Sequence, residues 1–214
     1  ITENTRFSYP LSCNPNVADG ARGGHPETIV LLTADAFGVL PPISVLEGTE
    51  VMYHFVQGFT SKLAGTEVGL TGAEATFSAC FGAPFMAHYP NVYAGLLKKK
   101  MEEHEGRCIL LNTGWTGGQA GEAERISIRD TRTLLNAALR GDLHDAGMEY
   151  DHHAVFNLRV PRSCPGIDAQ ILNPRNSWKD KSHYDSEANK LRDMFRANFE
   201  KNNFASFGIQ PTMY

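Results

Sequence analysis

The sequence predicts an α/β fold, with some mixed α+β character, from two kinds of segment that alternate along the chain. Continuous apolar runs at 29–32 and 107–114 are typical of strands buried on both faces. Runs with apolar residues three and four positions apart, at 88–104 and 185–202, are typical of amphipathic helices. Only three or four strands can be counted, which is few for a closed α/β domain, so we expect the sheet to be incomplete without further chain.

The composition is that of an ordinary folded protein. The chain has 214 residues, of which 42% are hydrophobic and 21% charged, enough for one sizeable core. A formal charge of −4 and a pI near 6.1 give no reason to expect nucleic-acid binding. No run of about 18 apolar residues is present, so no membrane span is expected. The four cysteines are widely spaced without a C-x-x-C pair, which favours free, mostly buried thiols in the cytosol or an organelle matrix rather than a secreted protein.

The first half of the chain contains one strong strand and one helix signal. The strand at 29–32 ends in Thr-Ala-Asp, and a Pro-Pro pair prevents a helix from starting directly after it. Ser44 is then a candidate cap for a helix over 48–61. The stretch 61–85 is dense in glycine and short of helix and strand signals, which is typical of a disordered connection or a functional lid.

The second half is expected to be helical apart from one irregular stretch. A helix that begins at 130 or 131 runs to 139 and is closed by Gly141. Residues 150–176 are rich in proline and irregular, with apolar alternation that predicts a strand at 155–161. The amphipathic pattern at 185–202 predicts the last helix of the chain.

A glycine-rich loop runs directly into an arginine and raises two alternatives. Gly117, Gly118 and Gly121 precede Arg125, and backbone amides together with a guanidinium can form an anion site. The same pattern is equally that of a tight turn between two elements. Asp35 also has two interpretations, because a carboxylate after a buried strand either binds a ligand or caps the next turn.

Two further polar features are weaker. Asp151, His152 and His153 resemble a metal cluster, but adjacent residues on a strand point to opposite faces, so a polar surface turn is favoured. We therefore name no metal ligand in this chain. Arg6 is a single cation near a chain end, and by itself such a residue is usually solvated.

The order of several long motifs resembles that of ATP-dependent phosphoenolpyruvate carboxykinases. The resemblance covers essentially the whole chain, 1–214, and is to the C-terminal part of that enzyme. The motifs are ENTRFSYPLS, IVLLTADAFGVLPPIS, MYHFVQGFTSKLAGTE, ATFSACFGAPF, LLNTGWTGG, RISIRDTR and PGIDAQILNPRNSW.

This resemblance implies a fold and an activity. The fold would be the family's C-terminal mononucleotide-binding domain, incomplete without the upstream chain. The family converts oxaloacetate and ATP to phosphoenolpyruvate, ADP and CO2 in gluconeogenesis, with Mg2+ and Mn2+. It also implies that the N-terminal portion of the same enzyme is the partner that holds most of the metal ligands.

The resemblance further assigns roles to individual residues. Arg6, in the ENTR motif, would contact the transferred phosphoryl group, where a planar guanidinium suits charge spread over three equatorial oxygens. Arg125, Ile126 and Thr131 would line the nucleotide site, and the glycine-rich loop before them would hold the nucleoside end of ATP. Residues 65–76 would form a mobile lid that excludes water from the reacting enolate. The lid residues named by the motif are Gly65, Thr66, Glu67, Gly69 and Gly72.

The departures from the family pattern keep alternatives open. The loop before Arg125 is longer than the usual form, and Glu124 stands where the family has a basic residue. The chain has no G-x-x-x-x-G-K-[ST] loop and no Asp-Asp pair, so we expect it to be inactive alone. The alternatives to an enzyme part are a non-catalytic carboxykinase-derived structural subunit and an isolated nucleotide-binding module.

Overall fold

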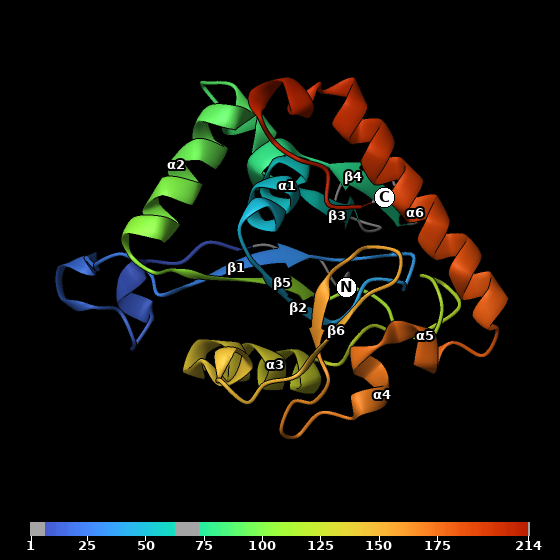
Figure 1. Cartoon of the computed structure of the whole chain (residues 1–214). Coiled ribbons are helices and arrows are strands. Elements are labelled where there is room, and N and C mark those ends of the chain that lie inside the picture. Colours follow the sequence, from blue (N-terminus) through green and yellow to red (C-terminus); the bar gives the residue numbers. More distant parts are fainter. Residues whose placement is uncertain (1–6, 63–72, 214) are drawn as a thin grey trace.

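The computed structural model describes residues 7–62 and 73–213, which form a mixed sheet with helices on both faces (Figure 1). The strand order of the five-stranded sheet in these residues is β1-β5-β2-β7-β6. Only β1 and β5 are parallel, and every other pairing in this sheet is antiparallel. The strands are β1 (Thr28–Thr33), β2 (Ile43–Leu46), β5 (Arg107–Asn112), β6 (Tyr150–His152) and β7 (Arg159–Pro161). The predicted α/β class is therefore confirmed in its coarser form, with a mixed sheet.

The parallel strands β1 and β5 have their carboxyl ends side by side. Thr28 pairs with Arg107 and, at the other end, Thr33 pairs with Asn112. The prediction of burial on both faces is confirmed for β5 but is wrong for part of β1, where Leu32 is 56% exposed. Its exposure follows from the position of β1 at the edge of the sheet, where a second neighbour is lacking in the described residues.

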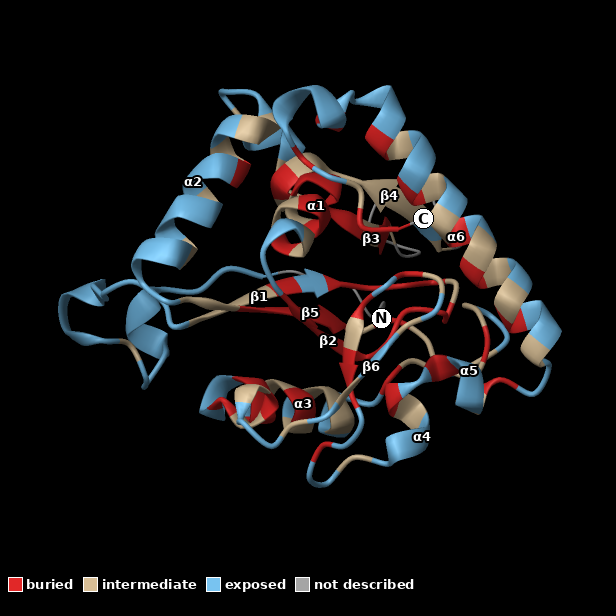
Figure 2. Cartoon of the chain, viewed as in Figure 1, coloured by how far each residue is buried: buried red, intermediate tan, exposed pale blue. Residues whose placement is uncertain are grey.

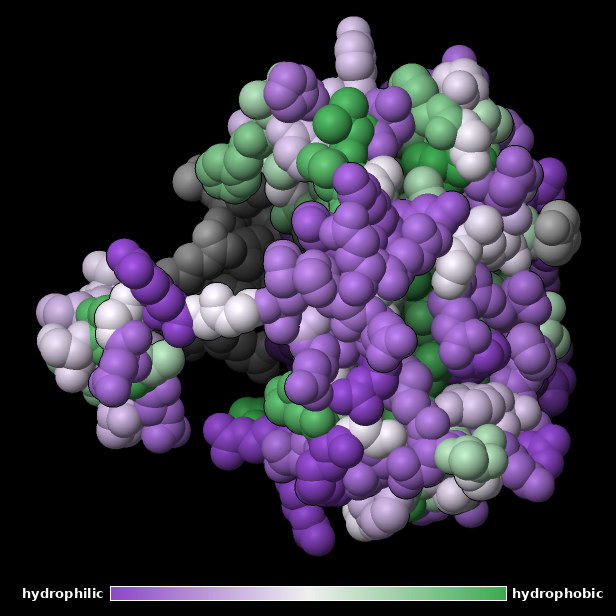
Figure 3. Space-filling model, turned by 60° about the vertical axis from the view of Figure 1, so that its left-hand side comes forward, coloured by the Kyte–Doolittle hydropathy of each residue, from purple (hydrophilic) through white to green (hydrophobic). Residues whose placement is uncertain are grey.

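Helices cover both faces of the sheet. In Figure 1, α1 (Thr49–Gln57), α2 (Pro90–Glu103) and α6 (Lys181–Lys201) lie on one side and α3 (Ile128–Arg140) on the other. Figure 2 shows that buried residues concentrate in the strands and in the helix faces directed toward them. On the side that carries α2, hydrophilic side chains predominate (Figure 3). None of the helices in the described part of the chain is both long and apolar enough to cross a bilayer.

The predicted helix over 48–61 is too long, and Ser44 does not cap it. Ser44 lies inside β2, and the helix ends before Gly58, which adopts a left-handed φ of 51°. A side chain at Gly58 would overlap the carbonyl of Ser78, so only glycine allows this close approach. The chain then continues as a strand, β3 (Phe59–Lys62).

The glycine-dense stretch contains a hairpin that the sequence did not indicate. β3 pairs antiparallel with β4 (Glu74–Phe77), from Phe59 opposite Phe77 to Lys62 opposite Glu74. The predicted lid over 65–76 therefore ends in regular structure, because 74–76 belong to β4. Its remaining part, with Gly65, Thr66, Glu67, Gly69 and Gly72, lies outside the described residues apart from 73.

The middle helices agree closely with their predictions. The pattern at 88–104 corresponds to α2, which begins at Pro90. α3 begins two residues earlier than predicted because Ser127 is its cap, with Oγ accepting a hydrogen bond from the amide of Asp130 at 3.0 Å. It ends as predicted at Gly141, whose φ is 85°.

The region 150–176 is more regular than predicted. Asp151 and His152 lie in the edge strand β6 rather than in a surface turn. The predicted strand at 155–161 shortens to β7, because the chain turns at Asn157 with a φ of 52°. Two short helices follow, α4 (Ala169–Leu172) and α5 (Pro174–Ser177).

The last helix also begins earlier than its apolar pattern. α6 starts at Lys181 instead of 185 because Asp180 caps it, accepting hydrogen bonds from the amides of Ser182 at 2.9 Å and His183 at 3.1 Å. Its buried face packs on the core. The buried residues of α6 are Tyr184, Ala188, Leu191, Phe195 and Phe199.

His54 is buried in the folded chain, and His153 is half-buried. His54 is 3% exposed and its ring contacts Tyr53 and Phe195. His153 lies with Nε2 2.7 Å from the hydroxyl of Tyr184. Burial lowers the pKa of each histidine from 6.5 to about 4, because the charged imidazolium is desolvated. Both are therefore neutral in the folded protein at neutral pH.

The free energy of unfolding should fall as pH drops from about 6.5 to about 4. In this window the unfolded chain binds protons at His54 and His153 while the folded chain does not, so protonation favours unfolding. The slope is up to about 1.4 kcal/mol per pH unit for each histidine. The measurement is urea unfolding at several pH values.

Replacing His54 with Gln should reduce this slope, because one buried titrating group is lost. His152→Gln is the matched control, since His152 is exposed on β6. An unchanged slope in His54→Gln would contradict the conclusion that His54 is neutral in the folded protein and gains a proton on unfolding.

Candidate functional site

Two buried polar side chains, Asp35 and Asn112, organise the ends of β1 and β5, and we call them the Asp35–Asn112 pair. Asp35 is 0% exposed and Asn112 is 1% exposed. The carboxylate of Asp35 accepts hydrogen bonds from the amides of Phe37 at 2.8 Å, Val39 at 2.7 Å and Leu40 at 2.8 Å. Burial raises the pKa of Asp35, and these amide donors oppose that shift. Of its two interpretations, the cap of the next turn is therefore confirmed.

Asn112 joins the two strand ends. Its Oδ1 accepts hydrogen bonds from the amides of Asp35 at 3.0 Å and Gly114 at 2.9 Å, and its Nδ2 donates to the carbonyl of Leu40 at 3.0 Å. A Cβ at Gly114 would overlap the backbone of Asp35. Glycine is thus required at 114 because the two chain segments are in direct backbone contact.

The residues after Gly114 form a short hairpin. The amide of Trp115 donates to the carbonyl of Asp35 at 3.0 Å, and Trp115 faces Arg125 in an antiparallel bridge. The amide of Ile126 donates to the carbonyl of Gly114 at 2.8 Å. The segment 117–123 is therefore the tip of a hairpin attached to the end of β5.

Three amides of the glycine-rich loop donate within the protein. Its Ala120 amide donates to the carbonyl of Ala36 at 2.8 Å, and the amides of Glu122 and Ala123 donate to the carbonyl of Gln119 at 3.0 Å. These donors are used by the protein itself, so they are not directed at an anion. Between the two alternatives for the loop, the structure favours a tight turn.

Arg125 is held at the base of this hairpin. Its Nε and Nη2 donate to the carbonyl of Thr113 at 3.1 and 2.9 Å. Its guanidinium carbon lies 5.2 Å from the centre of the Trp115 ring, a cation–π distance. Thr113 is itself bound to β1, because its amide donates to the carbonyl of Thr33 at 2.9 Å. The arginine thus sits where β1 and β5 end.

Ile126 and Thr131 lie next to Arg125 along the entry to α3. Ile126 is 7% exposed, while Thr131 is half-buried in the first turn, its amide donating to the carbonyl of Ser127 at 2.9 Å. Of the three sequence-predicted residues, Arg125 is bonded directly to the chain at the end of β5, Ile126 follows it, and Thr131 lies in the first turn of α3. The fourth, Arg6, lies outside the described residues, and the side chain of Glu124 is exposed.

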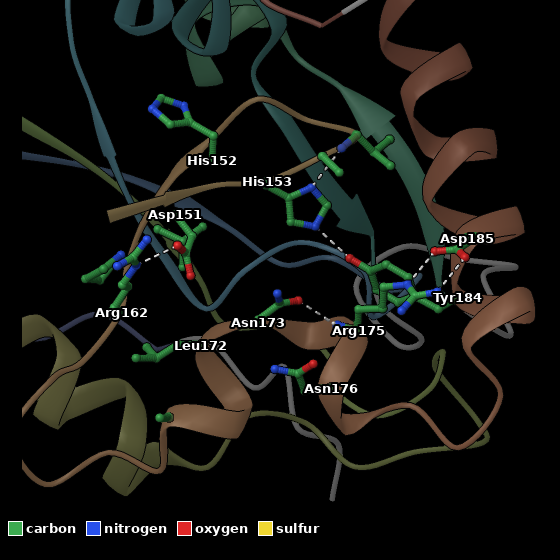
Figure 4. A pocket seen from close by; sticks show the side chains of 15 residues that line it. Asp151, His152, His153, Arg162, Leu172, Asn173, Arg175, Asn176, Tyr184 and Asp185 are labelled. Atoms are coloured by element: carbon green, nitrogen blue, oxygen red, sulfur yellow. Dashed lines mark hydrogen bonds and ion pairs between the residues drawn. The ribbon is translucent and has the colours of Figure 1, made fainter. Parts of the chain in front are cut away.

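A hollow lies away from this hairpin, between the strands β6 and β7 and the helices α4 to α6 (Figure 4). Its volume is about 500 Å³. Arg162 pairs with Asp151 at 2.6 Å and Arg175 with Asp185 at 2.8 Å, so these charged groups of its lining neutralise one another. Such a lining gives no reason to place the triphosphate of a nucleotide there.

The described residues do not fit a metal centre. Within residues 7–62 and 73–213, no group of three or more His, Cys, Asp and Glu side chains could hold a metal ion. His153, one member of the motif considered for this role, has its Nε2 beside the Tyr184 hydroxyl instead. We therefore assign no chemical step to a metal held by these residues.

Sequence patterns did not indicate the partners of Arg125. Thr113 lies 12 residues earlier and Trp115 lies in the opposite strand of the hairpin. The sequence feature that could have indicated Trp115 is its position directly after a strand and a glycine, where a large ring is close to the expected site. Asn112 could have been found in the same way, because it is the last residue of β5.

Comparison with known proteins agrees with the motifs. The family model described as phosphoenolpyruvate carboxykinase matches residues 1–170. Proteins named phosphoenolpyruvate carboxykinase (ATP) from Geotalea uraniireducens and Geobacter sp. are 53% and 54% identical over 201 residues, which is 94% of this chain and 38% of theirs. One from Brucella anthropi is 53% identical over 201 residues, 94% of this chain and 37% of its own. The chain therefore spans little more than a third of the length of these curated relatives.

Replacing Gly114 with Ala should destabilise the protein by about 2–4 kcal/mol, because the new methyl group overlaps the Asp35 backbone. The measurement is the free energy of unfolding in urea. Gly147→Ala is the matched control, since a Cβ at Gly147 meets nothing within 4 Å. Equal stability of both variants would show that the contact between the strand ends is not tight.

Proposed function

Because this chain belongs to the phosphoenolpyruvate carboxykinase family, we propose that it is part of an ATP-dependent enzyme that converts oxaloacetate and ATP to phosphoenolpyruvate, ADP and CO2 in gluconeogenesis. The observation that supports it most is the position of Arg125, whose Nε and Nη2 donate to the carbonyl of Thr113, the residue that follows β5. In open α/β sheets ligands bind at the carboxyl ends of the strands.

The part of ATP that meets this site is the nucleoside rather than the triphosphate. Loop amides at 120, 122 and 123 donate within the protein, and the Nε and Nη2 of Arg125 bind the Thr113 carbonyl. A triphosphate needs several amides and a lysine converging on it, and the chain has no G-x-x-x-x-G-K-[ST] motif to supply them. The β- and γ-phosphates would therefore be held by another part of the enzyme.

Arg6 and the lid complete the proposed role of this chain. Loss of CO2 from oxaloacetate leaves an enolate, whose oxygen attacks the γ-phosphorus of ATP while the bond to the β–γ bridging oxygen breaks and ADP leaves. A guanidinium at Arg6 would stabilise the charge that collects on the equatorial oxygens. Closure of residues 65–76 over the site would keep water from protonating the enolate.

The proposed partner is the remainder of the family polypeptide. The chain spans 38% of the length of its relative from Geotalea uraniireducens, and β1 offers an edge where Leu32 is 56% exposed. Mg2+ and Mn2+, which the family resemblance implies, would be bound outside the residues described here. A non-catalytic structural subunit is less well supported, because docking gives no reason for a guanidinium to be fixed at the carboxyl end of β5.

In the complete polypeptide, Arg125→Met should raise the KM for ATP about tenfold while the KM for oxaloacetate stays the same. The reason is the loss of a fixed guanidinium beside the nucleoside, which costs roughly 1–2 kcal/mol. The measurement is a carboxykinase assay with ATP, Mn2+ and oxaloacetate.

The matched control is Arg140→Met, at the far end of α3, where the arginine pairs with Asp142 at 2.7 Å. If Arg125→Met and Arg140→Met have the same KM for ATP, the nucleotide assignment fails. If the unaltered polypeptide forms no phosphoenolpyruvate, the enzyme proposal itself fails.

Replacing Arg6 with Ala should abolish turnover but leave ATP binding nearly unchanged, because Arg6 is proposed to contact the transferred group and not the nucleoside. Equilibrium dialysis with ATP and the same assay separate the two effects. Retained turnover in Arg6→Ala would contradict this role.

A further inference from the structure

The guanidinium of Arg125 is fixed by groups from two directions. In its plane, Nε and Nη2 donate to the Thr113 carbonyl at 3.1 and 2.9 Å. From the second direction, its carbon lies over the Trp115 ring, 5.2 Å from the ring centre. A carbonyl that accepts two bonds fixes the direction of the fork, and an aromatic face fixes the tilt of its plane.

Trp115 is itself immobilised by the backbone around it. Its amide donates to the carbonyl of the fully buried Asp35 at 3.0 Å, and its backbone forms a bridge with that of Arg125. Gly114, directly before it, is in backbone contact with Asp35, where even a Cβ does not fit. The indole therefore projects from a backbone segment that is bonded both to Asp35 and to Arg125.

A long arginine side chain loses rotamer freedom when it binds a ligand, and that loss weakens binding unless the side chain is ordered beforehand. We propose that Trp115 is a positioning residue for nucleotide binding, whose indole holds the guanidinium of Arg125 in the orientation that meets the nucleoside end of ATP. This inference rests on the proposed function, and it adds a residue to which no role has been assigned.

Two substitutions at position 115 separate the effect of an aromatic ring from the effect of side-chain volume. Phenylalanine at 115 keeps an aromatic face for the guanidinium, whereas leucine fills space without offering one. A purely structural role of Trp115 would respond to lost volume in both variants. If Trp115 positions Arg125, the affinity for ATP depends on an aromatic ring at 115, and the effect of that ring requires Arg125.

The experiment uses the complete polypeptide and measures the Kd for ATP by isothermal titration, together with the KM for ATP and for oxaloacetate. Trp115→Leu should weaken ATP binding about tenfold, within the range of a partly desolvated cation–π contact. Trp115→Phe should restore the Kd to within about threefold of the original. The KM for oxaloacetate should not change in either variant.

A double-mutant cycle tests whether Trp115 acts through Arg125. In an Arg125→Met background, Trp115→Leu should cause no further loss of ATP affinity, because the group that it positions is gone. Tyr89→Leu is the control for loss of an aromatic ring, since Tyr89 is 75% exposed on another part of the molecule. If Trp115→Leu does not fold, Trp115→Met, which fills similar space, takes its place in the cycle.

The outcomes separate this inference from the function on which it rests. If the unaltered polypeptide does not bind ATP, the proposed function fails and the inference with it. If it binds ATP and Trp115→Leu binds equally well, only the inference fails. Equal losses in Trp115→Phe and Trp115→Leu, or full additivity with Arg125→Met, would also overturn it, because either result indicates a structural role.

Discussion

The burial of two polar side chains at the end of the parallel strands is the constraint on which the rest of the site depends. Asp35 and Asn112 have almost no exposure, so each of their polar atoms needs a partner inside the protein. The chain supplies these partners with its own amides: three reach the Asp35 carboxylate and two reach Asn112 Oδ1. Satisfying the pair forces the turn after β1 and the residues after β5 into contact.

This contact explains the glycines at 38 and 114. A Cβ at Gly38 would overlap the carbonyl of Gly118, and one at Gly114 would overlap Asp35. The indole of Trp178 donates to the Gly38 carbonyl at 2.8 Å, and the Tyr184 hydroxyl donates to the Val39 carbonyl at 3.0 Å, which connects α6 to the same turn. The glycines therefore let backbone segments approach, and the residues beside them become rigid.

The sequence predicted those elements whose pattern lies within their own residues, and it missed those that depend on residues far away in the chain. The helix at 88–104 and the strand at 107–114 have periodicities complete within their own residues, so both were found. β2 and β6 have only four and three residues. They were missed because such short strands are stabilised by pairing with neighbouring strands rather than by a pattern of their own. For the site, the family motifs named Arg125, Ile126 and Thr131, and their role in nucleotide binding stays a prediction. Its contacts with Thr113 and Trp115 depend on a hairpin that no periodic pattern indicated.

The most direct test of the account is a crystal structure of the complete polypeptide with bound ATP. The account predicts that the adenine and ribose lie against Arg125 and Thr131 at the ends of β1 and β5, with the guanidinium still bonded to the Thr113 carbonyl. Its triphosphate would extend away from the 117–123 loop. A nucleotide held elsewhere, such as in the 500 Å³ hollow beside α5, with Arg125 untouched, would contradict it.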